Sequence, residues 1–275
     1  MSSCPRVSLV LLSLSTVFVC ILSATSWAQA SPSEQVQVKP PAMRMVDPPA
    51  PDATADDLET RGDDLHAQKL YLDALDYYQA ALAKSQNKSR ILNKVCRTQL
   101  MMAHWRDAKK SCERSIKANP KFADPYNNLG VALYGEAKFG SSIKEYRKAI
   151  ALDDQSASFY SNLGAAYFAR KDFEPALVAY QHALELDPEV FERSSRAGVQ
   201  AQLPSPEDRA RYDYTVAKLY AKMGFSDRAL EYLRKAMEDG YKDFKNVYKD
   251  EEFAQVRKDK RFAELMASRT VPLTE

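Results

Sequence analysis

The chain has 275 residues, with 39 Lys or Arg against 37 Asp or Glu and a formal net charge of +2. This balance argues against a dedicated nucleic-acid binder, which usually carries a strong basic excess on one face. Eight glycines, three histidines and four cysteines offer little material for glycine-rich phosphate loops or for a metal centre.

Residues 1–30 have the pattern of a secretory signal peptide. An apolar run from Val7 to Leu22 follows Arg6, and small residues come after it. The run is shorter than the roughly 20 residues of a membrane-spanning helix, although an uncleaved anchor is the competing interpretation. We expect cleavage near Ala28 or Ala30 and export to the periplasm or the medium. Membrane contact is then expected only through the transient signal peptide or a partner.

Residues 31–53 contain six prolines and show no apolar periodicity. Proline lacks a backbone N–H and interrupts both helices and sheets, so this segment is predicted to be a Pro-rich disordered linker. Alternatively, the segment is a ligand for a proline-binding module, but no residue in it favours this more specific interpretation.

The body of the chain is built from repeats of one constant length. Gly130 and Gly164 end two copies of one motif, and Gly62 and Cys96 stand at the same step upstream. Apolar residues recur at helical spacing in both halves of each unit, which predicts pairs of amphipathic helices. Such small pairs bury their apolar faces only by stacking. The predicted units are 55–88, 89–122, 123–156 and 157–190.

This pattern resembles the tetratricopeptide repeat, which places Leu-Gly, Tyr, Ala, an aromatic residue, Ala and Pro at fixed offsets within each repeat. Residues 157–190 match nearly every offset, through Tyr160, Leu163, Gly164, Tyr167, Ala176, Tyr180, Ala183 and Pro188. The resemblance implies an all-α fold, a right-handed superhelical solenoid of helix pairs with a concave face.

A fifth unit at 210–243 keeps the same offsets after an insertion at about 191–209. In the insertion Val199, Ala201 and Leu203 alternate with glutamines, which favours a short strand or β-hairpin before the last repeat. Long solenoid loops often lie on the binding face, and a tolerated surface insertion is the equal alternative. Residues 244–270 carry apolar positions amid many charges and are expected to form a C-terminal helical cap.

No motif in the sequence supports catalysis. Gly-x-Ser-x-Gly, His-Glu-x-x-His, Cys-x-x-Cys, Walker-type and Gly-x-Gly-x-x-Gly motifs are all absent. His66, His104 and His182 fall in three different units, and none has a second ligand at metal-binding spacing. We therefore expect no enzyme activity, no cofactor, no metal and no small-molecule substrate.

Cys96 and Cys112 occupy offsets 8 and 24 of the second unit. In an antiparallel pair that turns near offset 16 they lie at the same level, so a disulfide is possible if the Cα atoms are within about 7 Å. Such a loop would stabilise the fold by about 3 kcal/mol in the chain-entropy model. The secretory signal favours the disulfide over two buried thiols.

In the family, first-helix offsets 2, 5, 9 and 12 line the concave face, so the resemblance assigns partner binding to that face. Asn128 and Asn162, at offset 6, are candidates either to bond a ligand backbone or to cap local structure. Chaperone-binding members clamp a terminal carboxylate with Lys and Asn at offsets 5 and 9, and no unit here has that pair. The candidate partner-binding residues are Arg90, Asn93, Arg97, Asn127, Asn128, Val131, Tyr134, Ser161, Asn162, Phe168, Arg211, Tyr214 and Lys218.

The expected function is that of a non-catalytic scaffold in the cell envelope. It would bind a peptide or protein segment in its groove, with complementary charge, and no nucleic acid. A structural or self-assembling envelope protein is one alternative. An accessory subunit of an envelope enzyme, or of secretion or pilus machinery, is another.

Overall fold

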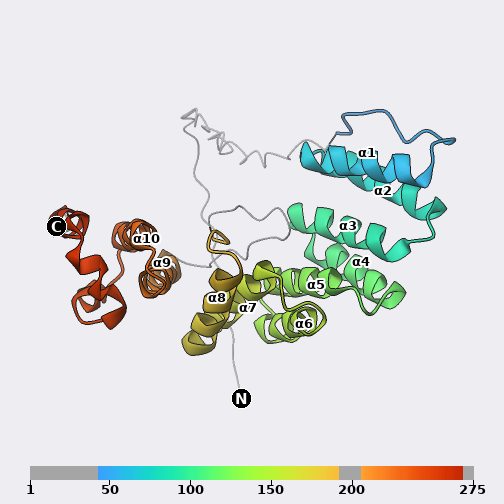
Figure 1. The fold of residues 1–275 in the computed structure, drawn as a ribbon. Helices are drawn as coiled ribbons and strands as arrows, with labels where there is room; N and C mark the ends of the chain where they lie inside the picture. The colour runs from blue at the N-terminus through green and yellow to red at the C-terminus, as the bar shows by residue number, and fades with distance from the viewer. Residues whose placement is uncertain (1–42, 192–205, 269–275) are drawn as a thin grey trace, which may run out of the picture. The chain divides into compact units, whose positions relative to one another are not determined.

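Helix follows helix in antiparallel pairs through residues 43–191 and 206–268, the parts of the chain that the computed structural model describes (Figure 1). All of these residues belong to one unit that spans 42–275. The predicted signal peptide and residues 192–205 of the predicted insertion, with its possible hairpin, lie outside them. The helices are α1 Ala55–Ala67, α2 Tyr71–Lys84, α3 Lys88–Met101, α4 Trp105–Ala118, α5 Ala123–Gly135, α6 Phe139–Leu152, α7 Ala157–Ala169, α8 Phe173–Leu186, α9 Pro206–Lys222, α10 Ser226–Glu238 and α11 Lys260–Ala267.

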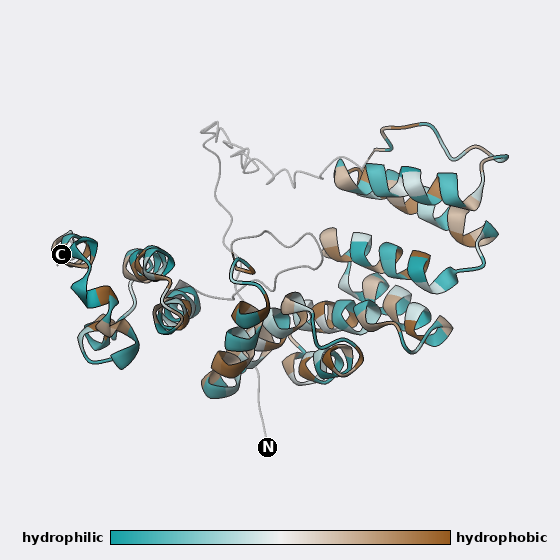
Figure 2. Cartoon of the chain, in the orientation of Figure 1, coloured by the Kyte–Doolittle hydropathy of each residue, from teal (hydrophilic) through white to brown (hydrophobic). Residues whose placement is uncertain are grey.

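Each pair packs on the next, and the described residues contain no strand. The all-α class and the stack of helix pairs are thus confirmed. Apolar and hydrophilic residues alternate around the helices, as burial of one face requires (Figure 2). The first, third and fourth pairs fall within the predicted repeat units. Helix α3 begins one residue before its unit, at Lys88, and α9 begins four residues before its unit, at Pro206. Proline is well suited to that first helical position because the N–H it lacks would have no helical partner.

Every pair turns at one residue in the left-handed conformation. These residues stand at the same offset of each unit, with φ between 57° and 83°. Side chains disfavour this region by about 1–2 kcal/mol, and only the last of the five is glycine. Each of the four turns without glycine therefore carries a conformational free-energy cost, which the packing of its two helices offsets. The five residues are Lys69, Ala103, Ala137, Lys171 and Gly224.

A close contact holds three of the pairs together. The glycine at offset 8 of the first helix faces the tyrosine ring at offset 24 of the second. A Cβ atom added at Gly130 or Gly164 would lie 2.5 Å from the ring of Tyr146 or Tyr180. Both tyrosines are fully buried. Only glycine permits this approach, so the small-residue column of the sequence has a packing cause.

Cys96 and Cys112 occupy these two positions in the second pair, and the structure joins them by a disulfide with a Cα–Cα distance of 5.3 Å. Both cysteines are fully buried. The covalent bond therefore stands where the first, third and fourth pairs have a glycine–tyrosine contact. Its loop of 16 residues corresponds to a stabilisation of about 3 kcal/mol in the chain-entropy model.

Residues 43–53 differ from the predicted disordered linker, because they bind along α2. The backbone N–H groups of Met45 and Val46 donate to the buried Asp73 carboxylate at 3.0 and 3.3 Å. Arg44 pairs with Asp76, and Lys84 donates to the carbonyl of Pro51 at 2.7 Å. Val46 and Ala53 pack against the apolar core of the first pair. We call residues 43–53 the N-terminal strap.

The C-terminal cap is only partly α-helical. Three short 3₁₀ helices, η1 Phe244–Tyr248, η2 Glu251–Ala254 and η3 Val256–Lys258, precede α11. Phe244, Phe253 and Val256 are buried at the end of the core that continues through the last four pairs. This segment packs on the final pair, as expected for a cap that follows the last repeat. Much of it is 3₁₀ helix, which is more tightly wound than the α-helix.

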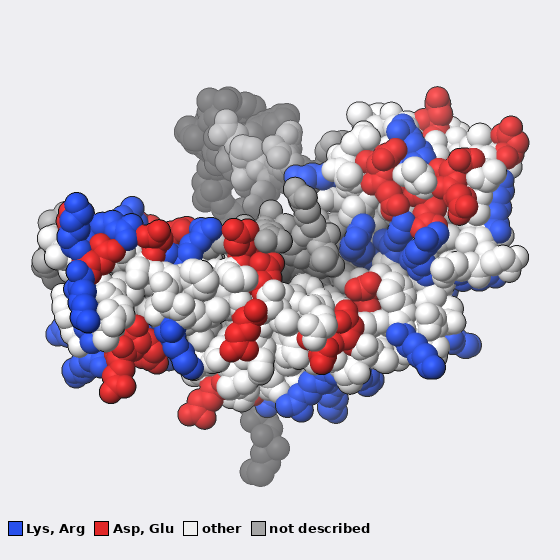
Figure 3. Space-filling view, viewed as in Figure 1, with Lys and Arg blue, Asp and Glu red and all other residues white. Residues whose placement is uncertain are grey.

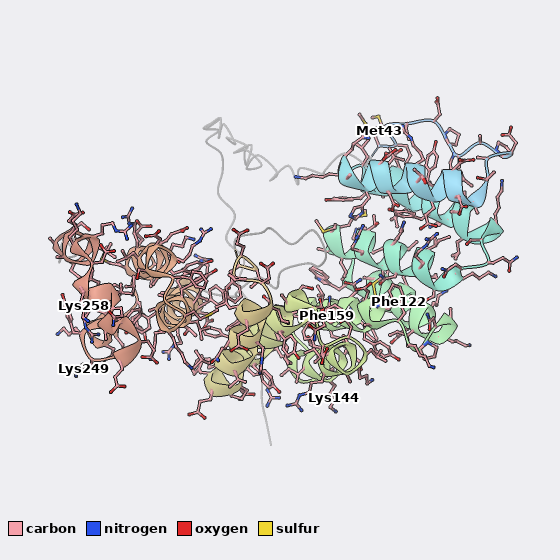
Figure 4. The ribbon with its side chains drawn as sticks, viewed as in Figure 1. Met43, Phe122, Lys144, Phe159, Lys249 and Lys258 are labelled. Carbon is pink, nitrogen blue, oxygen red and sulfur yellow. A yellow bond between two sulfur atoms is a disulfide. The ribbon has the colours of Figure 1, made fainter. Side chains whose placement is uncertain are left out.

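The left-handed turns generate a matched test. Lys171→Gly should raise the free energy of unfolding by about 0.5–1 kcal/mol, because glycine removes the side-chain penalty of the turn. Lys144→Gly, on the exposed face of α6 (Figure 4), should lower it by about 1 kcal/mol, because glycine weakens a helix interior. Urea unfolding followed by circular dichroism measures both variants. A loss of stability at both positions would contradict this account of the turn.

Candidate protein-binding surface

The first helices of the pairs carry the predicted groove positions. In the described part of the chain α3 contacts α5, and α5 contacts α7, in addition to their own second helices. These contacts bring side chains from successive repeats into one row. The structure therefore shows which candidate side chains remain accessible to a partner and which are buried or bonded between repeats.

Acidic α1 and basic α3 neutralise each other over much of their shared face. Arg90 donates to the buried Glu59 at 2.7 Å, and Lys94 lies 2.6 Å from both Glu59 and Asp63. Figure 3 shows acidic residues gathered over α1 and basic residues beside them over α3. Arg90 keeps a side chain that is 52% exposed. The acidic charge of α1 and the basic charge of α3 thus form largely an internal ion-pair network.

The predicted asparagines form a ladder between repeats. Asn128 donates to Asn93 at 2.9 Å, and Asn162 donates to Asn127 at 3.0 Å. A longer contact of 3.5 Å joins Asn127 to Asn128. Asn127, Asn128 and Asn162 are at most 4% exposed. Of the two roles open for Asn128 and Asn162, the structure places them as internal bonds, since buried amides need such partners.

The apolar candidates belong to the core. Val131, Tyr134 and Phe168 are at most 8% exposed. Phe168 packs edge-to-face against Phe173, with ring centroids 5.2 Å apart. Burial raises the pKa of Tyr134 to about 12, so its hydroxyl is neutral at physiological pH. The assignment of these three side chains to an open groove is therefore corrected, because neighbouring helices cover them.

The candidates on α9 are engaged by other parts of the chain. Arg211 lies over the Phe173 ring at 4.8 Å. The Tyr214 hydroxyl donates to Asp250 at 2.8 Å, and Lys218 pairs with the same carboxylate at 3.1 Å. Asp250 immediately precedes η2. The C-terminal cap thus occupies the groove positions of the fifth pair.

Arg97, on α3, is a cation without an ion pair. Its Nε atom is buried and has no hydrogen-bond partner, and no carboxylate of the described residues lies within 4.0 Å of its guanidinium. Nearby, burial and then the Arg97 charge lower the pKa of His66 to about 4. His66 is therefore neutral at physiological pH, and its Nδ1 contacts the Thr98 hydroxyl at 2.9 Å.

On the second to fourth repeats, the structure thus leaves four of the ten candidates at least partly accessible. Arg90 is exposed, and Asn93, Arg97 and Ser161 are half-buried. Lys94 was missed as the centre of the ion-pair network. The asparagine ladder could have been predicted from the sequence. Its two hydrogen bonds each join offset 6 of one unit to offset 5 of the preceding unit, a spacing of 35 residues.

A separate hollow of about 1220 Å³ lies between α10, η1 and α11, lined among others by Leu230, Tyr241, Arg261 and Leu265. Within residues 43–191 and 206–268 no three His, Cys, Asp or Glu side chains are grouped to hold a metal ion. No helix of those same stretches has both the length and the apolar character to cross a membrane.

Family comparisons agree with the repeat geometry. Residues 157–190 match the family model described as tetratricopeptide repeat, and residues 138–171 match one described as TPR repeat. The chain therefore contains tetratricopeptide repeats. Proteins built from these repeats mediate protein–protein interactions and are generally not enzymes.

Similar proteins share parts of this architecture. Over 103 residues the chain is 28% identical to the heat shock protein STI1 of Saccharomyces cerevisiae, covering 36% of this chain and 17% of the yeast protein. The structure of TTC0263, a TPR protein of Thermus thermophilus, has 21% identity, a TM-score of 0.48, and coverage of 78% of this chain and 100% of that one. MamA of Desulfovibrio magneticus RS-1 has 17% identity, a TM-score of 0.47, and coverage of 67% and 93%. These structural likenesses concern the fold and carry no information about a partner.

The ladder generates a test that separates structural from ligand-binding asparagines. Asn127→Ala leaves the buried Asn162 amide without its acceptor, so the free energy of unfolding should fall by about 1–3 kcal/mol. Ser161→Ala, on α7 beside Asn162, is the control and should change it by less than about 0.5 kcal/mol. Thermal and urea unfolding measure both. An Asn127→Ala protein of unchanged stability would contradict the structural role.

Proposed function

We propose that this chain is a non-catalytic scaffold that binds a protein segment across the first helices of its second to fourth repeats. The observation that carries the proposal is that segments of the chain itself bind to the first and fifth pairs, whereas candidates on the pairs between them remain accessible. The N-terminal strap covers the second helix of the first pair, and the C-terminal cap occupies α9. Between them, Arg90, Asn93, Arg97 and Ser161 stay at least partly accessible on α3 and α7.

The chemistry of these side chains suits recognition of a polypeptide. Asn93 uses its Oδ1 to accept from Asn128, so its amide N–H₂ can still donate to a ligand. Arg97 supplies a charged donor, and Arg90 is half exposed beside it on the same helix. The rigid, packed helices behind them hold these donors in place before a partner arrives, which reduces the entropy cost of binding.

We place this scaffold outside the cytoplasm, in the periplasm or the medium. The apolar run and small residues of residues 1–30 support export. The disulfide between Cys96 and Cys112 supports an oxidising compartment, because disulfides persist there and are rare in the reducing cytosol. Sequencing of the mature N-terminus tests export, with a start just after Ala28 or Ala30 expected and a retained Met1 contradicting it.

The binding surface is tested by site-specific photo-crosslinking in living cells. A photoreactive residue at Ser161, on the row of first helices, should capture a protein partner. The same residue at Lys117, exposed on α4 on the opposite side of the repeat, is the matched control and should capture none. Equal capture from both positions would place the binding site elsewhere. Capture of this chain alone would favour the self-assembling alternative.

A further inference from the structure

The fifth pair holds an acidic segment of the chain itself, at the positions that the family uses for partners. Lys218 lies 3.1 Å from Asp250 and 3.4 Å from Glu252, and the Tyr214 hydroxyl donates to Asp250. Phe253, in the same segment, is fully buried with its ring 5.6 Å from that of Tyr214. The first helix of the fifth pair thus binds an acidic segment through a cation, a hydroxyl donor and an apolar contact.

The second pair presents the same two positions on α3. The left-handed turn residue gives the register: Lys218 stands six residues before Gly224, and Arg97 stands six residues before Ala103. Tyr214 and Asn93 each stand four residues earlier. A donor and a cation, one helical turn apart, therefore occur in both pairs on the same face.

The two sites differ in what fills them. Lys218 has two carboxylates from its own chain, whereas Arg97 has no carboxylate of the described residues within 4.0 Å and a buried Nε without a partner. The two acidic groups that face α3 from α1 are already engaged, since Glu59 and Asp63 pair with Arg90 and Lys94. Asp124 on α5 interacts with Arg97 only at a distance longer than an ion pair. A buried guanidinium donor that lacks an acceptor gains most from an anionic one.

The local charge points to the same class of ligand. The second unit, residues 89–122, has nine Lys or Arg and only two Asp or Glu. In the first, third and fourth units acidic residues outnumber basic ones, and the fifth is nearly balanced. The overall charge of +2 therefore hides one strongly basic repeat, whose field attracts an acidic segment and orients it.

We infer that Arg97 and Asn93 bind an acidic side chain of a partner protein, in the way that Lys218 and Tyr214 bind Asp250. This inference rests on the proposed scaffold function and names the ligand chemistry of its second repeat. The carboxylate accepts from the Arg97 guanidinium and from the Asn93 amide, while Asn93 continues to accept from Asn128.

The test uses a fluorescent peptide with the sequence of residues 249–255, KDEEFAQ, and fluorescence anisotropy with the full-length protein. The wild type should bind it, and Arg97→Gln should weaken binding by about tenfold or more, since a charge-assisted bond is lost. Arg114→Gln, which removes the same charge from the exposed face of α4, should change it by less than about twofold. A peptide with amides in place of its three acids should bind far more weakly to the wild type.

Asn93→Asp provides a second variant that keeps the acceptor for Asn128 and places a carboxylate beside Arg97. It should weaken peptide binding as Arg97→Gln does, with a melting temperature no lower than that of the wild type, because the new carboxylate accepts from Arg97. No binding by the wild type would overturn the inference, as would equal losses in the Arg97 and Arg114 variants or equal binding of the amide peptide. If Ser161 still captures a partner in cells, the scaffold function stands and only the acidic specificity fails.

Discussion

The close approach of two helices within each pair is the constraint on which this structure depends. Three pairs achieve it with a glycine against a tyrosine ring, and the second achieves it with a disulfide between Cys96 and Cys112. A pair that opens at this point loses the apolar face on which its neighbour packs. The stacking of repeats, and the row of first helices that stacking creates, follow from this contact.

Stacking leaves two ends, and the chain closes both with its own segments. The N-terminal strap satisfies the buried Asp73 on α2, and the C-terminal cap satisfies Lys218 and Tyr214 on α9. An uncovered repeat face is an apolar docking surface, and these segments cover part of that surface on the first and the last pair. The first helices between the ends are then the part of the described chain best placed to receive a partner.

The constant repeat length was enough to predict the helix pairs, their order and the Gly130 and Gly164 column, because these depend on local pattern. The strap was not predictable, since its prolines indicate disorder and its partner Asp73 lies 28 residues from Met45. Family offsets found Arg97 and Asn93. The same offsets misplaced Val131 and Phe168, because burial depends on how tightly the next repeat packs rather than on position within one repeat.

A double-mutant cycle in the second pair tests whether a glycine–tyrosine contact can replace the disulfide at these two positions. Cys96→Gly and Cys112→Tyr are made singly and together, and melting is followed by circular dichroism. Each single change breaks the disulfide without restoring a fitted contact, whereas the double change recreates the glycine–tyrosine contact of the first, third and fourth pairs. We predict a double variant that melts above either single variant. A double variant that melts below both, with additive losses, would contradict the account.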